Sequence, residues 1–410
     1  MRAFASLRET LLLGNWSSRQ DAKIRKAARA VSPGWCRNAN TSMKSAKKRI
    51  LLVLPEVFGA TGGIQMFCRS LCLAAGRWAH QNNGSVDALV LNDADAPDSR
   101  YVNGGFRHFR SAGKSKAKLL ASYLQHVVPD PPDLVVFGHI SLAKLAVLPG
   151  IRLRKLCILT YGIEVWRPLA MAERKALQKA DAVLAISEYT RSEILKRNPL
   201  PPEKIRLIPP SLDPYWLADS QSPATAVPPV ILTVTRMAKD EDYKGVDSVI
   251  RSLPAVVAQL GGAVDYRIVG RGDDVPRLEA LAKELSVSRY VTFSGELTAD
   301  ALREQFRTCS LFVMPSEKEG FGIVFLEAMA YGKAVIGGAH GGTPSVIQDG
   351  ETGLLVERFD IGGIADAIVR VLKDDGLRLR LGRGGRERLL SVFTFQRFDA
   401  DIDAFLTSVF

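Results

Sequence analysis

The most constraining feature of this sequence is a strand, a glycine loop and a helix in succession between residues 311 and 331. Residues 311–315 form a short apolar run typical of a buried strand in a parallel sheet, and residues 323–331 suit a helix. Between them, Gly320 and Gly322 leave the loop free of side-chain bulk. Backbone N–H groups at the start of the helix can therefore point at an oxygen-rich or anionic ligand, so the unit predicts a ligand-binding loop.

Two glutamates bracket this loop. Glu319 lies at its mouth, and Glu327 lies within the apolar helix, where a buried carboxylate is costly unless a donor satisfies it. A sugar with two neighbouring hydroxyl groups is a suitable donor. A single carboxylate here would more simply cap a neighbouring element or pair with a Lys or Arg. Two of them around Gly-Phe-Gly favour a ligand site.

Apolar runs alternate with helical spacers along most of the chain. The predicted strands lie at residues 49–54, 86–91, 134–137, 156–160, 182–186, 204–208, 230–235 and 311–315. Further helices are expected from 63 to about 80 and at 115–127, 142–148, 189–197, 361–390 and 395–410. This alternation predicts an α/β protein with doubly wound parallel sheets, in which ligands bind outside the C-terminal ends of the strands.

Length and composition fit a globular chain of more than one domain. The 410 residues suggest two or three domains, and 47% hydrophobic residues allow substantial cores. Stretches rich in Pro, Ser and Ala indicate a linker. We expect a basic leader at 1–48, one Rossmann-like domain at 49–217, a linker at 218–229, a second such domain at 230–392 and a crossing helix at 393–410. The five cysteines have no metal-binding spacing, which predicts free thiols in a reducing compartment.

The formal net charge of +12 is concentrated at the N-terminus. Residues 1–49 hold twelve of the 55 Lys and Arg residues but only two acids, so the rest of the chain is nearly neutral. This distribution argues against a nucleic-acid-binding body. The leader has no secretory core, and no run in the chain is long enough to span a membrane. A transit peptide, a membrane-surface arm and a start set too early remain alternatives. We favour an over-long or disordered leader, with Met43 as the expected start of the enzyme.

A second basic stretch lies within the first predicted domain. It contains no acid between residues 100 and 118, and its basic residues are Arg100, Arg107, Arg110, Lys114, Lys116 and Lys118. The usual meaning of such a stretch is a solvated face.

Cations follow the first strand of the second predicted domain. Arg236 comes directly after this strand, and Lys244 precedes Gly245. A planar guanidinium and an ammonium at the C-terminal end of a strand suit a diphosphate that gains charge as it leaves. Lys239 and the acids between the two cations are predicted to form a solvated loop.

The first predicted domain offers its own candidates after its strands. A glycine loop that ends at Gly63 follows the first strand and precedes a helix, an arrangement that admits a phosphate close to backbone amides. His139 follows the strand at 134–137, and Tyr161 and Glu164 follow the strand at 156–160. A core histidine under a loop is the simpler interpretation of His139. The glycine loop alone could be a tight turn.

The motif from Glu319-Gly-Phe-Gly to Glu327, with seven residues between the two glutamates, resembles the signature of the retaining family-four glycosyltransferases of the GT-B fold, also described as glycosyl transferases group 1. The resemblance runs from about Arg49 to the C-terminus. It implies two facing Rossmann-like doubly wound domains, an acceptor-side one first and a nucleotide-sugar-binding one second. The C-terminal helix would cross back to the first domain.

The resemblance also implies roles for individual residues. Glu319, Arg236 and Lys244 would be catalytic, with Glu319 at the donor sugar and the two cations on the diphosphate, while Glu327 would hold the ribose hydroxyls. The residues implied in donor binding are Gly63, Arg236, Lys244, Gly295, Glu319, Gly320, Phe321, Gly322, Ile323 and Glu327. His139, Tyr161 and Glu164 would lie on the acceptor or sugar side. Tyr161 stands where many members have a histidine, which removes an imidazole role there.

The implied activity is hexosyl transfer with retention from a nucleoside-diphosphate sugar, GDP-mannose or a UDP-sugar, to a lipid-linked saccharide in surface polysaccharide biosynthesis. No metal or other cofactor is expected, because positive side chains replace a divalent ion at the diphosphate. By the same resemblance, a donor phosphate oxygen helps to take the acceptor proton. The basic stretch at 100–118 would lie against an anionic membrane, as in other members. The expected location is the cytoplasm, peripheral on the inner face of the membrane, with no nucleic-acid partner.

Two other classes of function compete with this one. Gly270 and Gly272 begin a dinucleotide fingerprint, which would suit a nicotinamide-dependent oxidoreductase, but Val275 stands where its third glycine belongs. A catalytically silent sugar-nucleotide-binding subunit is the other alternative, and Glu319, Arg236 and Lys244 argue against it. A metal-dependent variant could use Asp93 and Asp95, although their polar surroundings favour a loop.

Overall fold

The computed structural model describes residues 47–59, 62–94, 97–218 and 228–410. The predicted leader and linker lie largely outside these ranges, as does Asp95. Contacts within the chain divide it into two units. The first contains the chain up to Ala185, Glu193–Ile208 and Phe398–Phe410, and the second contains Ile186–Ser192 and Pro209–Arg397. The end of the chain therefore belongs to the first unit.

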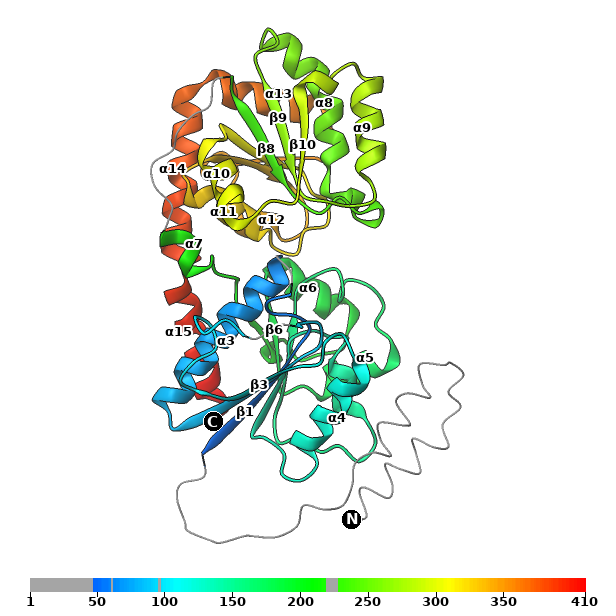
Figure 1. Cartoon of the computed structure of the whole chain (residues 1–410), viewed down its shortest axis with the longest axis vertical. Helices are drawn as coiled ribbons and strands as arrows, with labels where there is room; N and C mark the ends of the chain where they lie inside the picture. Colours follow the sequence, from blue (N-terminus) through cyan, green and yellow to red (C-terminus); the bar gives the residue numbers. More distant parts are fainter. Residues whose placement is uncertain (1–46, 60–61, 95–96, 219–227) are drawn as a thin grey trace. The chain divides into compact units, whose positions relative to one another are not determined.

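The first unit is built on a sheet of seven parallel strands in the order β3-β2-β1-β4-β5-β6-β7 (Figure 1). These are β1 (Lys48–Leu54), β2 (Gly84–Val90), β3 (Phe106–Ser111), β4 (Leu134–Phe137), β5 (Leu156–Thr160), β6 (Ala182–Ala185) and β7 (Ile205–Leu207). Between them lie α3 (Gly63–Gln81), α4 (Lys116–Val127), the 3₁₀ helix η1 (Ala143–Val147), α5 (Met171–Lys179), α6 (Glu188–Arg197) and η2 (Pro202–Lys204). The last five residues of β1 are all buried, as a strand covered on both faces requires.

The second unit contains six parallel strands in the order β10-β9-β8-β11-β12-β13. These are β8 (Val230–Val234), β9 (Asp265–Val269), β10 (Val291–Gly295), β11 (Leu311–Met314), β12 (Ala334–Gly338) and β13 (Leu354–Val356). Its helices are α7 (Pro214–Ala218), η3 (Lys239–Lys244), α8 (Val246–Gln259), α9 (Val275–Glu284), η4 (Ser288–Tyr290), α10 (Ala299–Thr308), α11 (Ile323–Ala330), α12 (Thr343–Val346), α13 (Ile361–Lys373) and α14 (Asp375–Val392).

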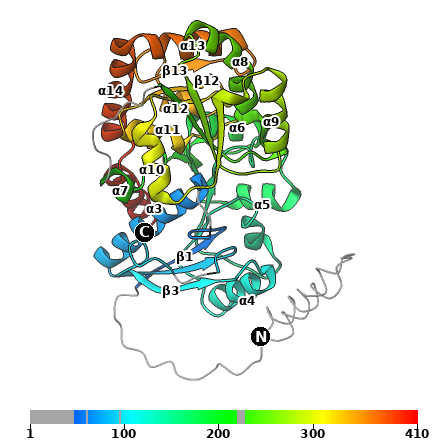
Figure 2. The same ribbon diagram turned by 45° about the horizontal axis from the view of Figure 1, so that its top comes forward.

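Helices cover both faces of the second sheet. Helices α8, α9 and α13 pack together on one side, while α11 and α14 pack together on the other (Figures 1 and 2). The two layers follow from right-handed crossovers that run in opposite directions from the centre of the sheet. Both units therefore have the predicted doubly wound α/β architecture.

The C-terminal helix α15 (Phe395–Val409) returns to the first unit, as predicted. The ring of Phe398 packs edge-on against Phe67, with 5.1 Å between centroids, and Phe410 stacks on Trp78 at 4.9 Å. Both partners lie on α3. Aromatic contacts from α15 and from the residue that follows it thus attach this end of the described chain to α3.

Among the strands not predicted from the sequence are β3, β12 and β13. β3 has the largely polar sequence Phe-Arg-His-Phe-Arg-Ser and lies at an exposed edge of the sheet. The helix expected at 142–148 is the 3₁₀ helix η1. The helices expected over 361–390 are α13 and α14, which are separated at Asp374, whose side chain accepts a hydrogen bond from the Leu377 N–H and caps α14.

All four cysteines in the described ranges are buried free thiols, namely Cys68, Cys72, Cys157 and Cys309. Cys36 lies outside these ranges. Among the helices of the described residues, none combines the length and the apolar character that crossing a bilayer requires.

The strand orders fix where ligand loops can gather. In the first sheet, connections diverge on either side of β1 and β4, and in the second they diverge at β8 and β11. In open α/β sheets, ligands bind beyond the C-terminal ends of the strands at such a switch point. A ligand site of the second unit is therefore expected at the loops after β8 and β11.

Candidate active site

The loops after β8 and β11 carry the catalytic residues predicted from the sequence. Arg236 and Lys244 follow β8, and Glu319 lies between β11 and α11. Lys244 Nζ donates to Glu319 Oε2 at 2.6 Å, and both side chains are mostly buried, with 18% and 16% exposed. The fold thus brings together two residues that are 75 positions apart in the sequence.

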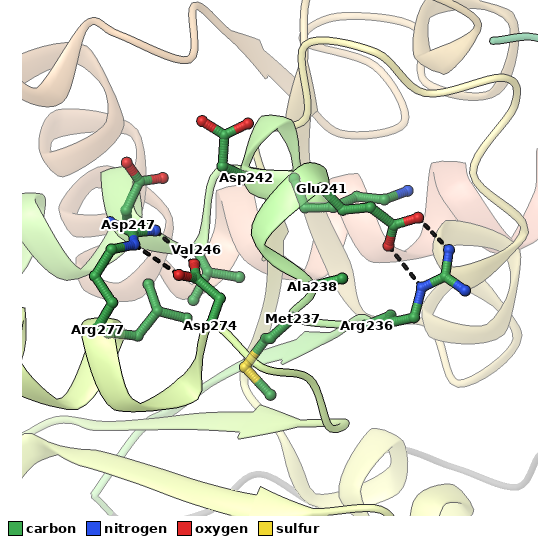
Figure 3. Close-up of a pocket in the computed structure, with 11 residues that line it drawn as sticks. Arg236, Met237, Ala238, Glu241, Asp242, Val246, Asp247, Asp274 and Arg277 are labelled. Carbon is green, nitrogen blue, oxygen red and sulfur yellow. Dashed lines mark hydrogen bonds and ion pairs between the residues drawn. The ribbon is translucent and has the colours of Figure 1, made fainter.

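Arg236 is bonded to Glu241 across the turn of η3. Its Nε donates to Glu241 Oε2 at 2.8 Å, and its Nη2 donates to the other carboxylate oxygen (Figure 3). Burial opposes ionisation of Glu241, but the Arg236 hydrogen bonds outweigh it and lower the pKa of this carboxyl. The guanidinium is 70% exposed while Glu241 is 13% exposed. The Arg236 guanidinium therefore faces outward and is held by the mostly buried Glu241 carboxylate.

The acids between Arg236 and Lys244 were predicted to form a solvated loop, and this prediction is wrong for Glu241, which is 13% exposed, while Asp242 is 59% exposed. Glu241 supports Arg236, and Asp242 Oδ2 lies 3.3 Å from Nη2 of the buried Arg358. The sequence spacing alone cannot indicate these pairs, because η3 folds back over a non-helical residue at position 241. Lys239 is anchored through its backbone N–H, which donates to the Asp273 side chain.

Gly270 and Gly272 allow two backbone segments of this site to pack closely against each other. The N–H of Met237 donates to the Arg271 carbonyl at 2.9 Å, and a Cβ at Gly272 would overlap the Met237 carbonyl. A Cβ at Gly270, where φ is +134°, would overlap the Thr235 carbonyl. These glycines therefore let the chain after β9 approach the chain after β8, which explains the pair without a dinucleotide.

A small pocket lies beside η3, and Arg236, Glu241 and Lys244 are among the residues that line it (Figure 3). Asp242, Asp247 and Asp274 also line it, together with Arg277, which donates to both Asp274 oxygens at 2.7 and 2.6 Å. The pocket wall therefore carries charges of both signs and includes the two cations predicted from the sequence.

The loop after β11 reaches α11 through a left-handed glycine. Gly322 caps the helix with φ +94°, and a Cβ there would lie 2.5 Å from the Phe325 ring. Phe321 and Ile323 beside it are buried, and Phe321 packs edge-on against Phe393. The backbone of Gly320–Gly322 is thus held by packing while the first N–H groups of α11 have no intrahelical partner.

A second pair of glycines, Gly341 and Gly342, packs against the backbone of the Glu319 loop. The N–H of Gly342 donates to the Glu319 carbonyl at 2.6 Å, and a Cβ at Gly342 would overlap the Gly320 carbonyl. Gly341, with φ +68°, lies equally close to the Glu319 backbone. The loop after β12 therefore fixes the main chain that carries Glu319.

Glu327 is buried in α11, as its apolar neighbours predicted, with 7% exposed. Burial, and to a smaller extent the nearby Asp213 carboxylate, raises its pKa to about 8. No ion pair reaches Glu327 within the described ranges, so the alternative of a Lys or Arg partner does not hold. An uncompensated buried carboxyl is the state expected of a group that awaits hydrogen-bond donors.

Gly295 ends β10 in the left-handed region, with φ +66°. Its carbonyl accepts from the Gly270 N–H at 2.8 Å, which ties the end of β10 to the loop after β9. A Cβ at Gly295 would meet no atom within 4 Å. The glycine is therefore required for backbone conformation rather than for a close approach.

In the first unit, Gly63 begins α3, and Asp93 organises the loop before it. The Asp93 carboxylate accepts hydrogen bonds from the backbone N–H groups of Val57, Phe58 and Gly59, at 2.9 to 3.1 Å. Asp93 is 1% exposed, so these three N–H groups satisfy the hydrogen-bonding capacity of a buried carboxylate. This role differs from the metal ligand considered above. The described residues contain no group of three or more His, Cys, Asp or Glu side chains arranged to hold a metal ion.

His139 and Tyr161 lie together at the ends of β4 and β5, with their rings stacked at 6.3 Å. His139 Nδ1 lies 3.1 Å from the Ser141 N–H that donates to it, and burial lowers the imidazole pKa. The Tyr161 hydroxyl is directed into the core, 3.6 Å from Cys68 Sγ. Glu164 accepts from the Tyr161 backbone N–H at 2.5 Å. In this conformation neither the Tyr161 hydroxyl nor that Glu164 oxygen is available to a sugar, and only the half-exposed His139 remains at the surface.

Two family descriptions match the chain in succession. Glycosyltransferase Family 4 matches residues 61–215, and Glycosyl transferases group 1 matches residues 218–388. The two matches adjoin and leave only the ends of the chain uncovered. The chain therefore belongs to the family-four glycosyltransferases of the GT-B fold, as its motifs predicted, and the nicotinamide-dependent alternative is not favoured.

One relative matches along nearly its whole length, and another matches over a shorter stretch. The GDP-mannose-dependent alpha-(1-6)-phosphatidylinositol monomannoside mannosyltransferase of Mycobacterium tuberculosis is 29% identical over 385 residues, which cover 87% of this chain and 98% of that protein. The N-acetyl-alpha-D-glucosaminyl L-malate synthase of Bacillus anthracis is 35% identical over 154 residues, 38% of this chain and 39% of that protein. The longer match extends through both units.

Solved structures share the fold. The sucrose-phosphate synthase of Thermosynechococcus elongatus has a TM-score of 0.71 at 21% identity, covering 88% of this chain and 99% of that one. The Anabaena HepE protein in complex with UDP and glucose has a TM-score of 0.67 at 18% identity, covering 88% and 100%. These similarities establish the GT-B architecture of the chain.

Proposed function

We propose that this glycosyltransferase moves a hexose, with retention of anomeric configuration, from a nucleoside-diphosphate sugar to a saccharide acceptor. The Lys244–Glu319 contact carries this proposal, because it joins a cation for the diphosphate to a carboxylate for the sugar at the switch point of the second sheet. Arg236 supplies a second cation, and Glu327 holds the ribose hydroxyls.

The mechanism follows from where charge develops. As the bond between the anomeric carbon and the β-phosphate oxygen breaks, the leaving diphosphate gains negative charge, which Arg236, Lys244 and the N–H groups at the start of α11 stabilise. The acceptor hydroxyl forms the new bond on the same face, and a phosphate oxygen takes its proton. Both cations are bonded to carboxylates in the free protein: Arg236 faces outward on Glu241, and the donor replaces Glu319 at Lys244.

We propose GDP-mannose as the first donor to test and a UDP-sugar as the second. The GDP-mannose dependence of the mycobacterial relative supports GDP-mannose, and the HepE complex with UDP and glucose supports a UDP-sugar. A lipid-linked saccharide, in the assembly of a surface polysaccharide, is the proposed acceptor, since that relative acts on a phosphatidylinositol mannoside. The enzyme would work in the cytoplasm, on the inner face of the membrane, through the basic stretch at 100–118.

The proposal is tested by screening nucleotide sugars for release of the nucleoside diphosphate in the presence of lipid-linked acceptors. The expected result is turnover with one base and sugar, loss of turnover in Lys244→Ala and Glu319→Gln, and an α-linked product from an α-linked donor by NMR. A β-linked product would contradict retention. Turnover should also survive excess EDTA, because Arg236 and Lys244 supply the positive charge, and strict dependence on Mg²⁺ or Mn²⁺ would contradict that role.

A further inference from the structure

Arg358 is a buried cation that the proposed mechanism leaves without a role. It follows β13, and its side chain is only 6% exposed. Nη1 lies 3.3 Å from Glu317 Oε2, and Nη2 lies 3.3 Å from Asp242 Oδ2 and 3.7 Å from Asp247 Oδ1. Its guanidinium also stacks on Phe359, 4.6 Å from the ring centroid. Burying a guanidinium is costly, and the carboxylates around it compensate that cost and fix its position.

The three carboxylates belong to the two segments that form the candidate active site. Asp242 lies in η3, two residues before Lys244, and Asp247 lies in the first turn of α8. Glu317 lies two residues before Glu319 in the loop after β11. One guanidinium therefore connects the segment that carries the diphosphate cation to the segment that carries the sugar carboxylate.

Main-chain contacts hold the same two segments at a fixed distance. The Glu317 N–H donates to the Tyr243 carbonyl at 2.9 Å. Gly245, with φ +77°, lies so close to Pro315 that a Cβ would be 2.6 Å from the Pro315 carbonyl oxygen. These contacts define the spacing at one point. The planar guanidinium of Arg358 contacts Asp242 in one segment and Glu317 in the other. These two further contacts restrict the rotation of one segment relative to the other.

We propose that Arg358 is a positioning residue that holds Lys244 in register with Glu319 for the diphosphate, an inference that rests on the proposed function. Within the described ranges no hydrogen bond or ion pair joins Arg358 to Lys244 or Glu319, so it acts through the loops. A lysine would keep the charge but lacks the rigid fork, so Arg358→Lys separates geometry from net charge. Without the fork, three carboxylates beside a phosphate site are free to repel one another and the ligand.

The test measures dissociation constants of the full-length protein for GDP and GMP, or for UDP and UMP if the donor screen selects uridine. Arg358→Lys is compared with Lys244→Ala, with the double variant and with Arg378→Lys, a control on α14 whose 14%-exposed guanidinium pairs with Asp375. We expect Arg358→Lys to weaken diphosphate binding about tenfold and monophosphate binding less than about threefold. In the Lys244→Ala background the same change should have less than about a threefold effect, and the control should match the unmodified protein.

The outcomes separate the two proposals. Equal weakening of diphosphate and monophosphate, or full additivity with Lys244→Ala, would overturn the positioning role while leaving the diphosphate role of Lys244 intact. Unchanged diphosphate affinity in Lys244→Ala would overturn both. If Arg358→Lys does not fold, Glu317→Gln replaces it, because this carboxylate is 37% exposed and its loss removes one of the same bonds. It should weaken diphosphate binding selectively, and equal loss for monophosphate would count against the proposal.

Discussion

Glu327 is a buried carboxyl group that no cation pairs with among the described residues. Its neighbours in α11 are apolar and buried, and the nearest charge that influences it is another carboxylate, Asp213. Its pKa of about 8 means that it is mostly protonated at pH 7 in the free protein. The folded state therefore binds this proton more tightly than the unfolded chain does, where the ordinary value of 4.5 applies.

The first prediction is that this carboxyl makes stability fall as pH rises. Its contribution is fully present below pH 4.5 and is lost as pH rises through 8, because the unfolded chain releases the proton first. Denaturant unfolding at pH 5.5 to 8 should show a decline of the unfolding free energy up to about 1.4 kcal/mol per pH unit steeper than in Glu327→Gln. Identical slopes in the two proteins would show that the carboxyl is not protonated in the folded state.

The second prediction concerns the bond between Arg236 and Glu241. Because the negative charge of this carboxylate offsets that of the guanidinium, Glu241→Gln should bind the nucleoside diphosphate more tightly, by up to about tenfold, and release it more slowly. Calorimetry and stopped-flow displacement would measure the two effects. Weaker binding would mean instead that Glu241 orients Arg236 toward the phosphates.

At this scale the sequence predicted residues that lie on the loops after β8 and β11 and in α11, but not the residues that support them. Glu319, Glu327, Arg236 and Lys244 follow recognisable loops, so their spacing is informative. Arg358 pairs with acids 41 and 116 positions away, and no local pattern indicates such partners. The Tyr161 hydroxyl could not be assigned either, because its contact with Cys68 spans 93 positions.

Among the elements, the close packing of one loop on another sets the shape of the site. The third prediction is that Gly342→Ala displaces the Glu319 loop, because the new Cβ would overlap the Gly320 carbonyl. Turnover should fall at least about tenfold, with destabilisation of about 1–3 kcal/mol. Gly362→Ala in α13 is the matched control, since its Cβ would meet only Asp360 Oδ1 at 3.6 Å. Normal turnover in Gly342→Ala would show that the loop adjusts without consequence.

Several apolar runs were predictable as buried strands, and the polar edge strand was not. β1 and β11 are continuous apolar runs, which only a covered parallel sheet accommodates. β12 is also fully buried, but its sequence Ala-Val-Ile-Gly-Gly holds only three apolar side chains before two glycines. β3 has one neighbour and exposes its charged residues, so its sequence resembles a loop. The helices predicted over 361–390 are confirmed as α13 and α14, and the Asp374 side chain caps the second of them.

At the scale of the molecule, the basic residues at 100–118 divide into those paired with acids of the same unit and those that are not. Arg107 donates to the buried Asp87, which His108 also contacts at 3.0 Å, and Arg100 donates to Asp98. These two arginines have internal partners. Arg110, Lys114, Lys116 and Lys118 are the exposed remainder, on and after the edge strand β3.

The fourth prediction is that these four residues bring the enzyme to anionic vesicles. Each contributes about 1 kcal/mol near an anionic surface, so changing all four to Gln should abolish most binding at low salt and lower transfer to a lipid-linked acceptor. Co-sedimentation measures the binding. The control changes four exposed basic residues elsewhere in the first unit, Arg152, Arg174, Lys175 and Lys179, and should retain it. Equal loss in both variants would indicate only a general charge effect.

The return of α15 also has a consequence for the order in which the chain can fold. Phe410 stacks on Trp78, and the Lys48 ammonium lies 5.4 and 5.3 Å from the two rings, so the first strand and the last residue share one small cluster. During synthesis the first sheet is made long before its final helix leaves the ribosome. The second unit can assemble while the first still exposes the α3 surface that α15 will cover. The first sheet is translated before the second unit, and the unit built on it is therefore completed after the second one.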